Sequence, residues 1–143
     1  MIYVRKIAFS KMRIDSLLSP SDLIPQLGRF WQLSGQKKLW WRHGKPGDKL
    51  VLQVPVAEAG KYEVIGCMGH AQDYGIFKIK INGVDVGSTD FYLAGLDWRK
   101  QSLGTFDLPI GFVLLEVECT GRNPAAEPRF MFGLDYLLLN KKN

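Results

Sequence analysis

Residues 76–86 constrain the fold of this chain more than any other stretch. Apolar residues alternate there with Lys78 and Lys80, and Asn82-Gly83 follows directly. Alternation with a period of two is typical of a half-buried strand. An Asn-Gly pair between two such strands favours a type I′ turn, because both central residues of that turn need positive φ. The sequence therefore predicts a tight antiparallel hairpin at this point.

The same alternation recurs along most of the chain, with turn residues between the alternating runs. It predicts strands at residues 2–9, 49–56, 61–68, 103–108, 112–119 and 130–139. Many short strands separated by turns are typical of a β-sandwich or a barrel. No long helix is expected, and only Ser21–Ile24 favours a short helical turn. We therefore predict an all-β protein.

Length and composition indicate one folded domain. The chain has 143 residues, of which 46% are hydrophobic and 23% charged, as in an ordinary globular protein. We assign residues 1–37 to an N-terminal strand and connecting segment of the same domain, and residues 38–143 to the main β-sandwich. The net charge of +5 is spread along the chain, so no nucleic-acid partner is expected. No apolar run approaches the ~20 residues of a membrane helix, so no membrane partner is expected either.

The compartment and the redox state are less constrained. The basic N-terminus lacks the apolar core of a signal peptide. A domain of an exported parent protein, extracellular or periplasmic, would have the same features, so the localisation stays open. Cys67 and Cys119 each lie in an apolar run without metal-binding spacing. They predict two buried free thiols, with one disulfide as the alternative.

The last predicted strand contains one carboxylate, Asp135, in an otherwise apolar run. An ionised carboxylate in an apolar core is costly unless it is paired or bound to a metal. Asp135 therefore faces away from the core, caps the start of the strand, or holds a cation.

Several short motifs follow one another in an order that resembles a known group of β-sandwich domains. In chain order they are Gly47-Asp48, Gly60-Lys61-Tyr62, Asp73-Tyr74-Gly75, Asn82-Gly83, Leu103-Gly104, Gly121-Arg122-Asn123-Pro124 and Phe132-Gly133-Leu134-Asp135-Tyr136. This order resembles the galactose-binding-like jelly rolls, especially carbohydrate-binding modules of families 6 and 35 and accessory domains of bacterial glycoside hydrolases. The resemblance covers residues 38–140.

The resemblance implies an antiparallel β-sandwich of jelly-roll type without catalysis of its own, which binds sugar in loops or on one sheet face. It also implies a structural calcium, held by N-terminal acidic residues and by an Asp that opens the last strand. Asp135 matches that Asp. The usual Glu-x-Glu of the first strand is absent, and only Asp15 lies near its place. The implied partners are a carbohydrate and a catalytic domain of the same parent protein.

A sugar site needs an aromatic face for the C–H bonds and polar groups for the hydroxyls. Adjacent Trp40 and Trp41 must point to opposite faces of a strand, so we expect one of them in the core. Trp98 is the favoured platform, because it lies in a polar stretch, residues 90–99, that we expect to be a long connection. The aromatic candidates are Trp31, Trp40, Trp41, Tyr74, Tyr92 and Trp98.

Polar candidates lie in three predicted loops. If these loops meet at one end of the sandwich, they form a shared pocket, where Arg holds a carboxylate or hydroxyls. The alternative for Asp73 and Asn123 is that each caps its own turn, and the alternative for each Trp is a place in the core. The predicted ligand-binding set is Trp98, Tyr74, Asp73, Tyr92, Arg122 and Asn123.

Catalytic motifs are missing from the sequence. It contains no Gly-x-Ser-x-Gly or His-Glu-x-x-His, and neither His43 nor His70 adjoins a nucleophile. Paired carboxylates for glycoside hydrolysis stay open, since they meet in space. We predict a non-catalytic carbohydrate-binding accessory module of a larger carbohydrate-active protein. The alternative is a structural or assembly β-sandwich that mediates contact between proteins or domains.

Overall fold

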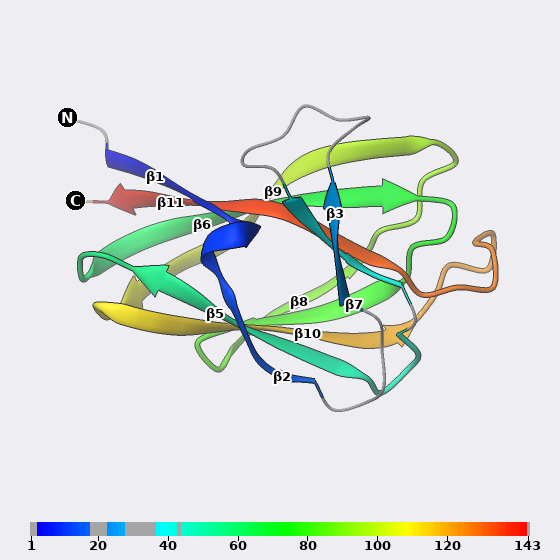
Figure 1. Ribbon diagram of the computed structural model, residues 1–143, viewed down its shortest axis with the longest axis horizontal. Coiled ribbons are helices and arrows are strands. Elements are labelled where there is room, and N and C mark those ends of the chain that lie inside the picture. The colour runs from blue at the N-terminus through cyan, green and yellow to red at the C-terminus, as the bar shows by residue number, and fades with distance from the viewer. Residues whose placement is uncertain (1–2, 18–22, 28–36, 43, 143) are drawn as a thin grey trace.

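The computed structural model describes residues 3–17, 23–27, 37–42 and 44–142, which form two antiparallel β-sheets (Figure 1). The elements in chain order are β1 (Tyr3–Ala8), the 3-10 turn η1 (Phe9–Lys11), β2 (Arg13–Leu17), β3 (Leu23–Leu27), β4 (Lys37–Trp41), β5 (Lys49–Val56), β6 (Gly60–Ala71), β7 (Ile76–Ile81), β8 (Val84–Asp90), β9 (Leu96–Leu108), β10 (Gly111–Gly121) and β11 (Phe132–Lys142). The six-stranded sheet has the order β3-β4-β11-β6-β9, with β1 also paired with β11, and the five-stranded sheet has the order β2-β5-β10-β7-β8. The prediction of an all-β antiparallel sandwich is confirmed.

The hairpin predicted at Asn82-Gly83 is present between β7 and β8. Asn82 has φ 48° and Gly83 has φ 85°, so both central residues of the turn lie in the left-handed region. Ile81 pairs directly with Val84 across the turn. The type I′ requirement therefore explains why Asn and Gly occupy these two positions.

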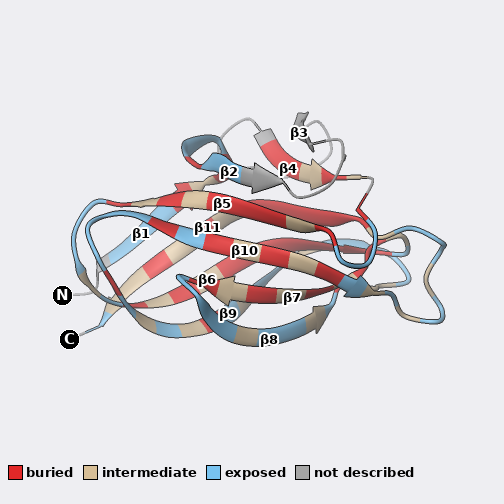
Figure 2. Ribbon diagram, turned by 90° about the horizontal axis from the view of Figure 1, so that it is seen from below, coloured by how far each residue is buried: buried red, intermediate tan, exposed pale blue. Residues whose placement is uncertain are grey.

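The core lies between the two sheets, and β7 and β10 contribute to it by alternation of buried and more exposed residues (Figure 2). In β5 the inward residues Leu50, Leu52, Val54 and Val56 are each at most 2% exposed. An aromatic cluster lies at the end of the core where β11 begins: the Phe77 ring centroid is 5.2 Å from that of Phe132, 5.7 Å from that of Trp41 and 6.2 Å from that of Phe91. Such ring pairs add about 0.5–1.5 kcal/mol each to the burial of their area.

Trp40 and Trp41 point to opposite faces of β4, as predicted. Trp41 is fully buried in the core, whereas Trp40 lies partly buried on the outer face of the six-stranded sheet. The two buried cysteines are free thiols, as the sequence predicted. Within the described residues, no helix is long and apolar enough to cross a membrane.

The structure corrects the extent of two predicted elements. β9 begins at Leu96 rather than at residue 103, so Trp98 is a strand residue and not part of a long connection. The reason is that β9 is an edge strand paired along the whole of β6, and its largely exposed side chains give little alternation. Leu23 and Ile24, expected in a helical turn, begin β3 and pair with β4. Trp31 and His43 lie outside the described residues.

Candidate functional site

A row of four residues crosses the outer face of the six-stranded sheet where β11 begins. Trp40 of β4 pairs with Gly133 of β11, and Gly69 of β6 pairs with Trp98 of β9. Leu134 pairs with Met68, which brings Gly133 beside Gly69. Residues in register across a sheet share a face. Two glycines therefore leave a floor of bare backbone between two indole rings.

Tyr74 and Trp98 lie directly on this floor. A Cβ atom at Gly133 would lie 2.9 Å from Tyr74 Oη and 3.0 Å from Trp98 Cη2, and one at Gly69 would lie 3.0 Å from Tyr74 Cε2. Contacts this short would force the rings to shift if a Cβ atom were present, so glycine at both positions allows the rings to lie against the backbone. The signal in the sequence that could have indicated this backbone floor is one glycine within β6, Gly69, and one within β11, Gly133.

These rings form the wall of a cavity of about 150 Å³, which we call the Trp98 pocket. Trp98 is half-buried, and the pocket also contains the Asp73 carboxylate, whose side chain is 25% exposed. Tyr74 is only 4% exposed, and burial followed by the charge of Asp73 raises the pKa of its phenol. Trp40 Nε1 donates to Met131 Sδ at 3.1 Å. The lining residues are Trp40, Ala71, Asp73, Tyr74, Leu96, Trp98 and Met131.

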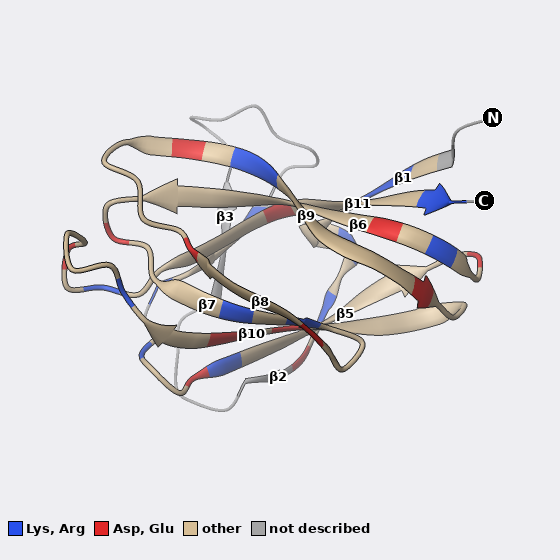
Figure 3. Ribbon diagram, turned by 180° about the vertical axis from the view of Figure 1, so that it is seen from behind, with Lys and Arg blue, Asp and Glu red and all other residues tan. Residues whose placement is uncertain are grey.

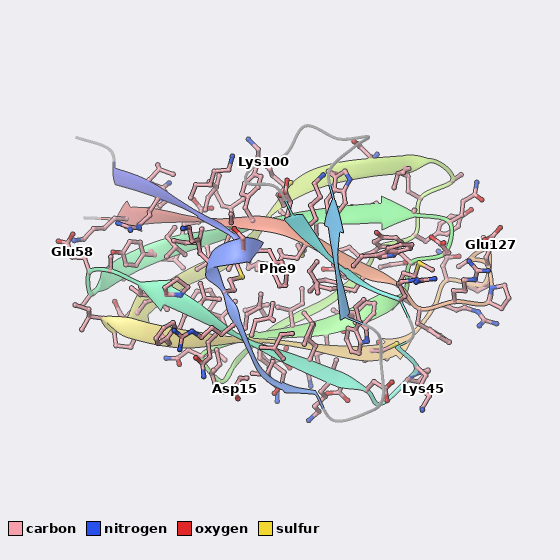
Figure 4. The ribbon with its side chains drawn as sticks, viewed as in Figure 1. Phe9, Asp15, Lys45, Glu58, Lys100 and Glu127 are labelled. Carbon is pink, nitrogen blue, oxygen red and sulfur yellow. The ribbon has the colours of Figure 1, made fainter. Side chains whose placement is uncertain are left out.

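The loop of residues 122–131 packs against the loop of residues 72–75 at this end of the sandwich, the end that Glu127 marks in Figure 4. The Met131 N–H donates to the Asp73 carbonyl at 3.0 Å, and the Gly75 N–H donates to the Met131 carbonyl at 3.0 Å. Arg129 Nη1 lies 4.0 Å from Asp73 Oδ2. Backbone hydrogen bonds therefore fix the main chain of Asp73 at the pocket wall, and its carboxylate lies near a guanidinium.

Asn123 and Arg122 take structural positions in the same loop. Asn123 Nδ2 donates to Asp90 Oδ2 at 2.9 Å, and its Oδ1 accepts from the Ala125 N–H at 2.9 Å, as an Asx turn does. The Arg122 guanidinium lies 5.2 Å from the centroid of the Phe130 ring. Neither residue lines the Trp98 pocket. The Asn123 amide instead ties this loop to the end of β8.

Of the six predicted ligand-binding residues, the structure brings three into one pocket: Trp98, Tyr74 and Asp73. Tyr92 lies next to the pocket, because it forms a β-bridge with Ala71, a lining residue. Half of the predicted set therefore lines one pocket. Trp98 belongs to a strand, whereas the sequence predicted it in a loop.

A buried ion pair adjoins the pocket, and its cation was not anticipated from sequence. Lys38 Nζ lies 3.9 Å from Asp135 Oδ2 and 3.8 Å from the centroid of the Trp98 ring. The two side chains are 0% and 2% exposed. Burial lowers the pKa of Lys38, and the charge of Asp135 opposes that shift. The pair lies on the outer face of the sheet together with Trp98, so Asp135 faces away from the core, the first of its three alternatives, and its charge is paired with the Lys38 ammonium.

The residues described here do not fit a calcium ion at Asp135. The neighbouring charge is the Lys38 ammonium, which repels a metal. Asp15 lies on β2 of the other sheet, where its Oδ1 accepts from Gln53 Nε2 at 2.8 Å. Calcium takes six to eight oxygen ligands. Within the described ranges, no group of three or more His, Cys, Asp or Glu residues comes close enough together to hold a metal ion.

Neither a protein-family model nor a curated protein sequence matches this chain. Solved structures do match. A xanthan lyase from Paenibacillus is similar with a TM-score of 0.79 and 21% identity over 96% of this chain, which spans only 13% of the lyase chain. A family 35 carbohydrate-binding module from Clostridium thermocellum has a TM-score of 0.59 and 17% identity, with 96% of this chain and 97% of the module covered.

A third match is a family 36 carbohydrate-binding module in complex with calcium and xylotriose. Its TM-score is 0.52 and its identity 15%, with 96% of this chain and 99% of that chain covered. The chain has the β-sandwich fold of these carbohydrate-binding modules. The resemblance found in the order of the sequence motifs is thereby confirmed at the level of fold.

Proposed function

We propose that this chain is a non-catalytic carbohydrate-binding module of a larger carbohydrate-active protein, and that the Trp98 pocket holds the sugar. The observation that carries the proposal is a half-buried indole and a carboxylate facing one cavity over a floor of bare backbone. An indole face takes up the apolar C–H side of a pyranose ring, and Asp73 accepts hydrogen bonds from its hydroxyls.

The comparisons support the modular part of the proposal. The chain is as long as an isolated family 35 module, and it matches a small part of a much larger lyase. A shallow pocket of about 150 Å³ buries little of a sugar chain. We therefore expect weak binding, because the gain must offset the immobilised hydroxyls.

Affinity electrophoresis in gels that contain neutral β-linked polysaccharides tests this function. Asp73→Asn keeps the size of the side chain and removes its charge, and Trp98→Ala removes the platform. Both variants should migrate like the protein in a gel without sugar. Arg122→Ala, outside the pocket, is the matched control and should be retarded like the unmodified chain. Equal retardation of all three variants would contradict the assignment of the pocket.

Calcium dependence provides a separate test. Because Lys38 already lies beside Asp135, we expect calcium or EDTA to leave the melting temperature and the retardation unchanged. A rise in melting temperature with calcium, lost in Asp15→Asn or Asp135→Asn, would instead assign these carboxylates to a metal site.

The alternative of an assembly domain is favoured by one observation on the other sheet. Ile110, Phe112 and Leu114 are 69%, 49% and 40% exposed at the end of the five-stranded sheet where β10 begins. If no polysaccharide retards the chain and a neighbouring domain binds through this apolar surface, the assembly function replaces the carbohydrate function.

A further inference from the structure

A second cavity lies toward the end of the sandwich that Glu58 marks in Figure 4, away from the loops around Glu127. Its volume is about 470 Å³, and it lies between β1, η1 and β2 on one side and the ends of β5 and β10 on the other. Four of its lining residues are cationic and none is acidic: Arg5, Lys6, Lys11 and Arg13. We call it the basic cavity.

The four cations gather at one cavity without an acidic lining residue, unlike the paired lysines of the five-stranded sheet. Several lysines of other strands do lie beside carboxylates: Lys78 Nζ is 3.2 Å from Asp85 Oδ2, and Lys80 Nζ is 3.8 Å from Glu116 Oε2. Figure 3 shows basic segments on β7 and acidic segments on the neighbouring β10. None of the four cavity cations forms an ion pair with a described carboxylate. Their positive charge therefore stays available to a ligand.

Aromatic rings, rather than carboxylates, hold two of these cations in place. The Arg13 guanidinium carbon lies 5.6 Å from the centroid of the Phe112 ring, and Lys6 Nζ lies 4.5 Å from that of Tyr136. A ring contact orients a cation without cancelling its charge. The donors of both groups stay accessible, since Lys6 and Arg13 are exposed.

The cavity also offers an apolar surface. Phe112 is 49% exposed and pairs with Pro55 of β5, and both residues line the cavity. An exposed ring beside a proline suits the flat apolar side of a pyranose, and the guanidinium groups suit carboxylate or sulfate groups. A nucleic acid would favour a stripe of cations along its backbone rather than one cavity.

We propose that the basic cavity is a second binding site of this chain, and that it takes an anionic saccharide. A uronate carboxylate or a sulfate group would pair with Arg5, Lys11 and Arg13, and one sugar ring would stack on Phe112. The proposal extends the carbohydrate-binding function proposed above, but it concerns different residues and a charged class of ligand. The chain would then bind one saccharide by shape at the Trp98 pocket and an acidic one by charge.

Isothermal titration of the full chain at low salt tests this site with four probes: an oligogalacturonate, a sulfated galactan oligosaccharide, a neutral galactan oligosaccharide of equal length, and polyglutamate. We expect the acidic saccharides to bind more tightly than the neutral one. The variant with Arg5→Gln, Lys11→Gln and Arg13→Gln should weaken that binding by about tenfold or more, since charge-assisted contacts are lost. Whichever acidic saccharide binds identifies the anionic group.

Two controls keep the test decisive. A variant with Lys45→Gln, Lys61→Gln and Lys100→Gln removes the same charge from exposed positions outside the cavity, and should bind like the unmodified chain. Equal loss in both triple variants would overturn the proposal, because net charge alone would explain binding. Equal binding of polyglutamate at the same residues would overturn it in favour of an acidic peptide.

The outcome is separable from that of the first proposal. Trp98→Ala should leave oligogalacturonate binding intact while it abolishes retention by neutral polysaccharides. If no neutral polysaccharide binds but the acidic saccharides still depend on Arg5, Lys11 and Arg13, the Trp98 assignment fails and the basic cavity stands.

Discussion

The Trp98 pocket and the basic cavity form binding surfaces on the same sandwich by different means. In the pocket, the rings of Tyr74 and Trp98 lie on bare backbone at Gly133, so packing sets its shape. In the basic cavity, four exposed cations and the half-exposed Phe112 ring are lining residues, so charge defines the site. Packing acts only between atoms in contact, whereas an exposed charge acts over about 10 Å before ordinary salt screens it. Substitutions in the pocket should therefore have their main effect on the free energy of unfolding. Those in the basic cavity should have their main effect on ligand affinity.

The largest effect should come from the buried cation that adjoins the pocket. Lys38→Met leaves the Asp135 carboxylate buried without the ammonium that now lies 3.9 Å away. Breaking a buried pair in this way typically costs about 3–5 kcal/mol, because the remaining charge is poorly solvated. Urea denaturation should show this fall in the free energy of unfolding.

The same substitution on an exposed lysine is the control. Lys100→Met, on β9, should change the free energy of unfolding by less than about 0.5 kcal/mol. The double variant of Lys38→Met with Asp135→Leu should recover most of the loss, since no buried charge then remains. If Lys38→Met is as stable as the unmodified chain, the ion pair does not hold this face together.

The second effect concerns the backbone floor of the pocket. Gly133→Ala places a Cβ atom 2.9 Å from Tyr74 Oη, so the ring must move. Overpacking of this kind typically costs about 1–3 kcal/mol. Thermal unfolding measures the loss, and near-ultraviolet circular dichroism reports the moved rings. Gly95→Ala is the matched control, because a Cβ atom there meets nothing within 4 Å. Equal melting temperatures for the two variants would contradict the required close approach.

Most of the fold could be predicted from local patterns, namely the alternation of apolar residues in strands and the turn residues between them. The alternation in β5, β7 and β10 survives in the structure, because each strand has one face in the core. The start of β9 was missed because an edge strand has no comparable buried face, and its polar residues resemble those of a loop.

The candidate sites were harder to predict, since they depend on register between distant strands. Trp98 belongs to β9 and Gly133 to β11, which do not follow each other in the chain. No local sequence pattern therefore predicts that the ring lies against the glycine. Lys38 stands beside Lys37 in the sequence, and only the pairing of β4 with β11 brings it to Asp135. Asp135 alone was noticed, because a carboxylate in an apolar run needs an explanation.

Acid pH should lower the stability of the protein through His70, which adjoins Gly69 of the pocket floor in the sequence. His70 is 9% exposed between Gly69 and Ala71, and burial, followed by the charge of Arg99, lowers its pKa from the ordinary value. The unfolded chain then binds the proton more readily than the folded one. The stability that neutral His70 contributes is complete above its unfolded pKa and is lost as pH falls toward the lowered one.

Thermal unfolding between pH 8 and pH 5 measures this loss. His70→Leu should reduce the fall in melting temperature over that interval, because one titrating group is gone. An unchanged slope would show that the carboxylates alone account for acid sensitivity.

The smallest effect on stability should come from Phe112→Ala in the basic cavity. The ring is 49% exposed and its described cation contact is the Arg13 guanidinium, so its removal should cost less than about 1 kcal/mol. Oligogalacturonate binding should nevertheless fall severalfold, because the stacking surface is lost and Arg13 is no longer oriented. Phe112→Tyr keeps the ring and should restore binding. A large loss of stability in Phe112→Ala with binding intact would contradict the distinction between the two sites. The basic cavity would then depend on packing and not on charge.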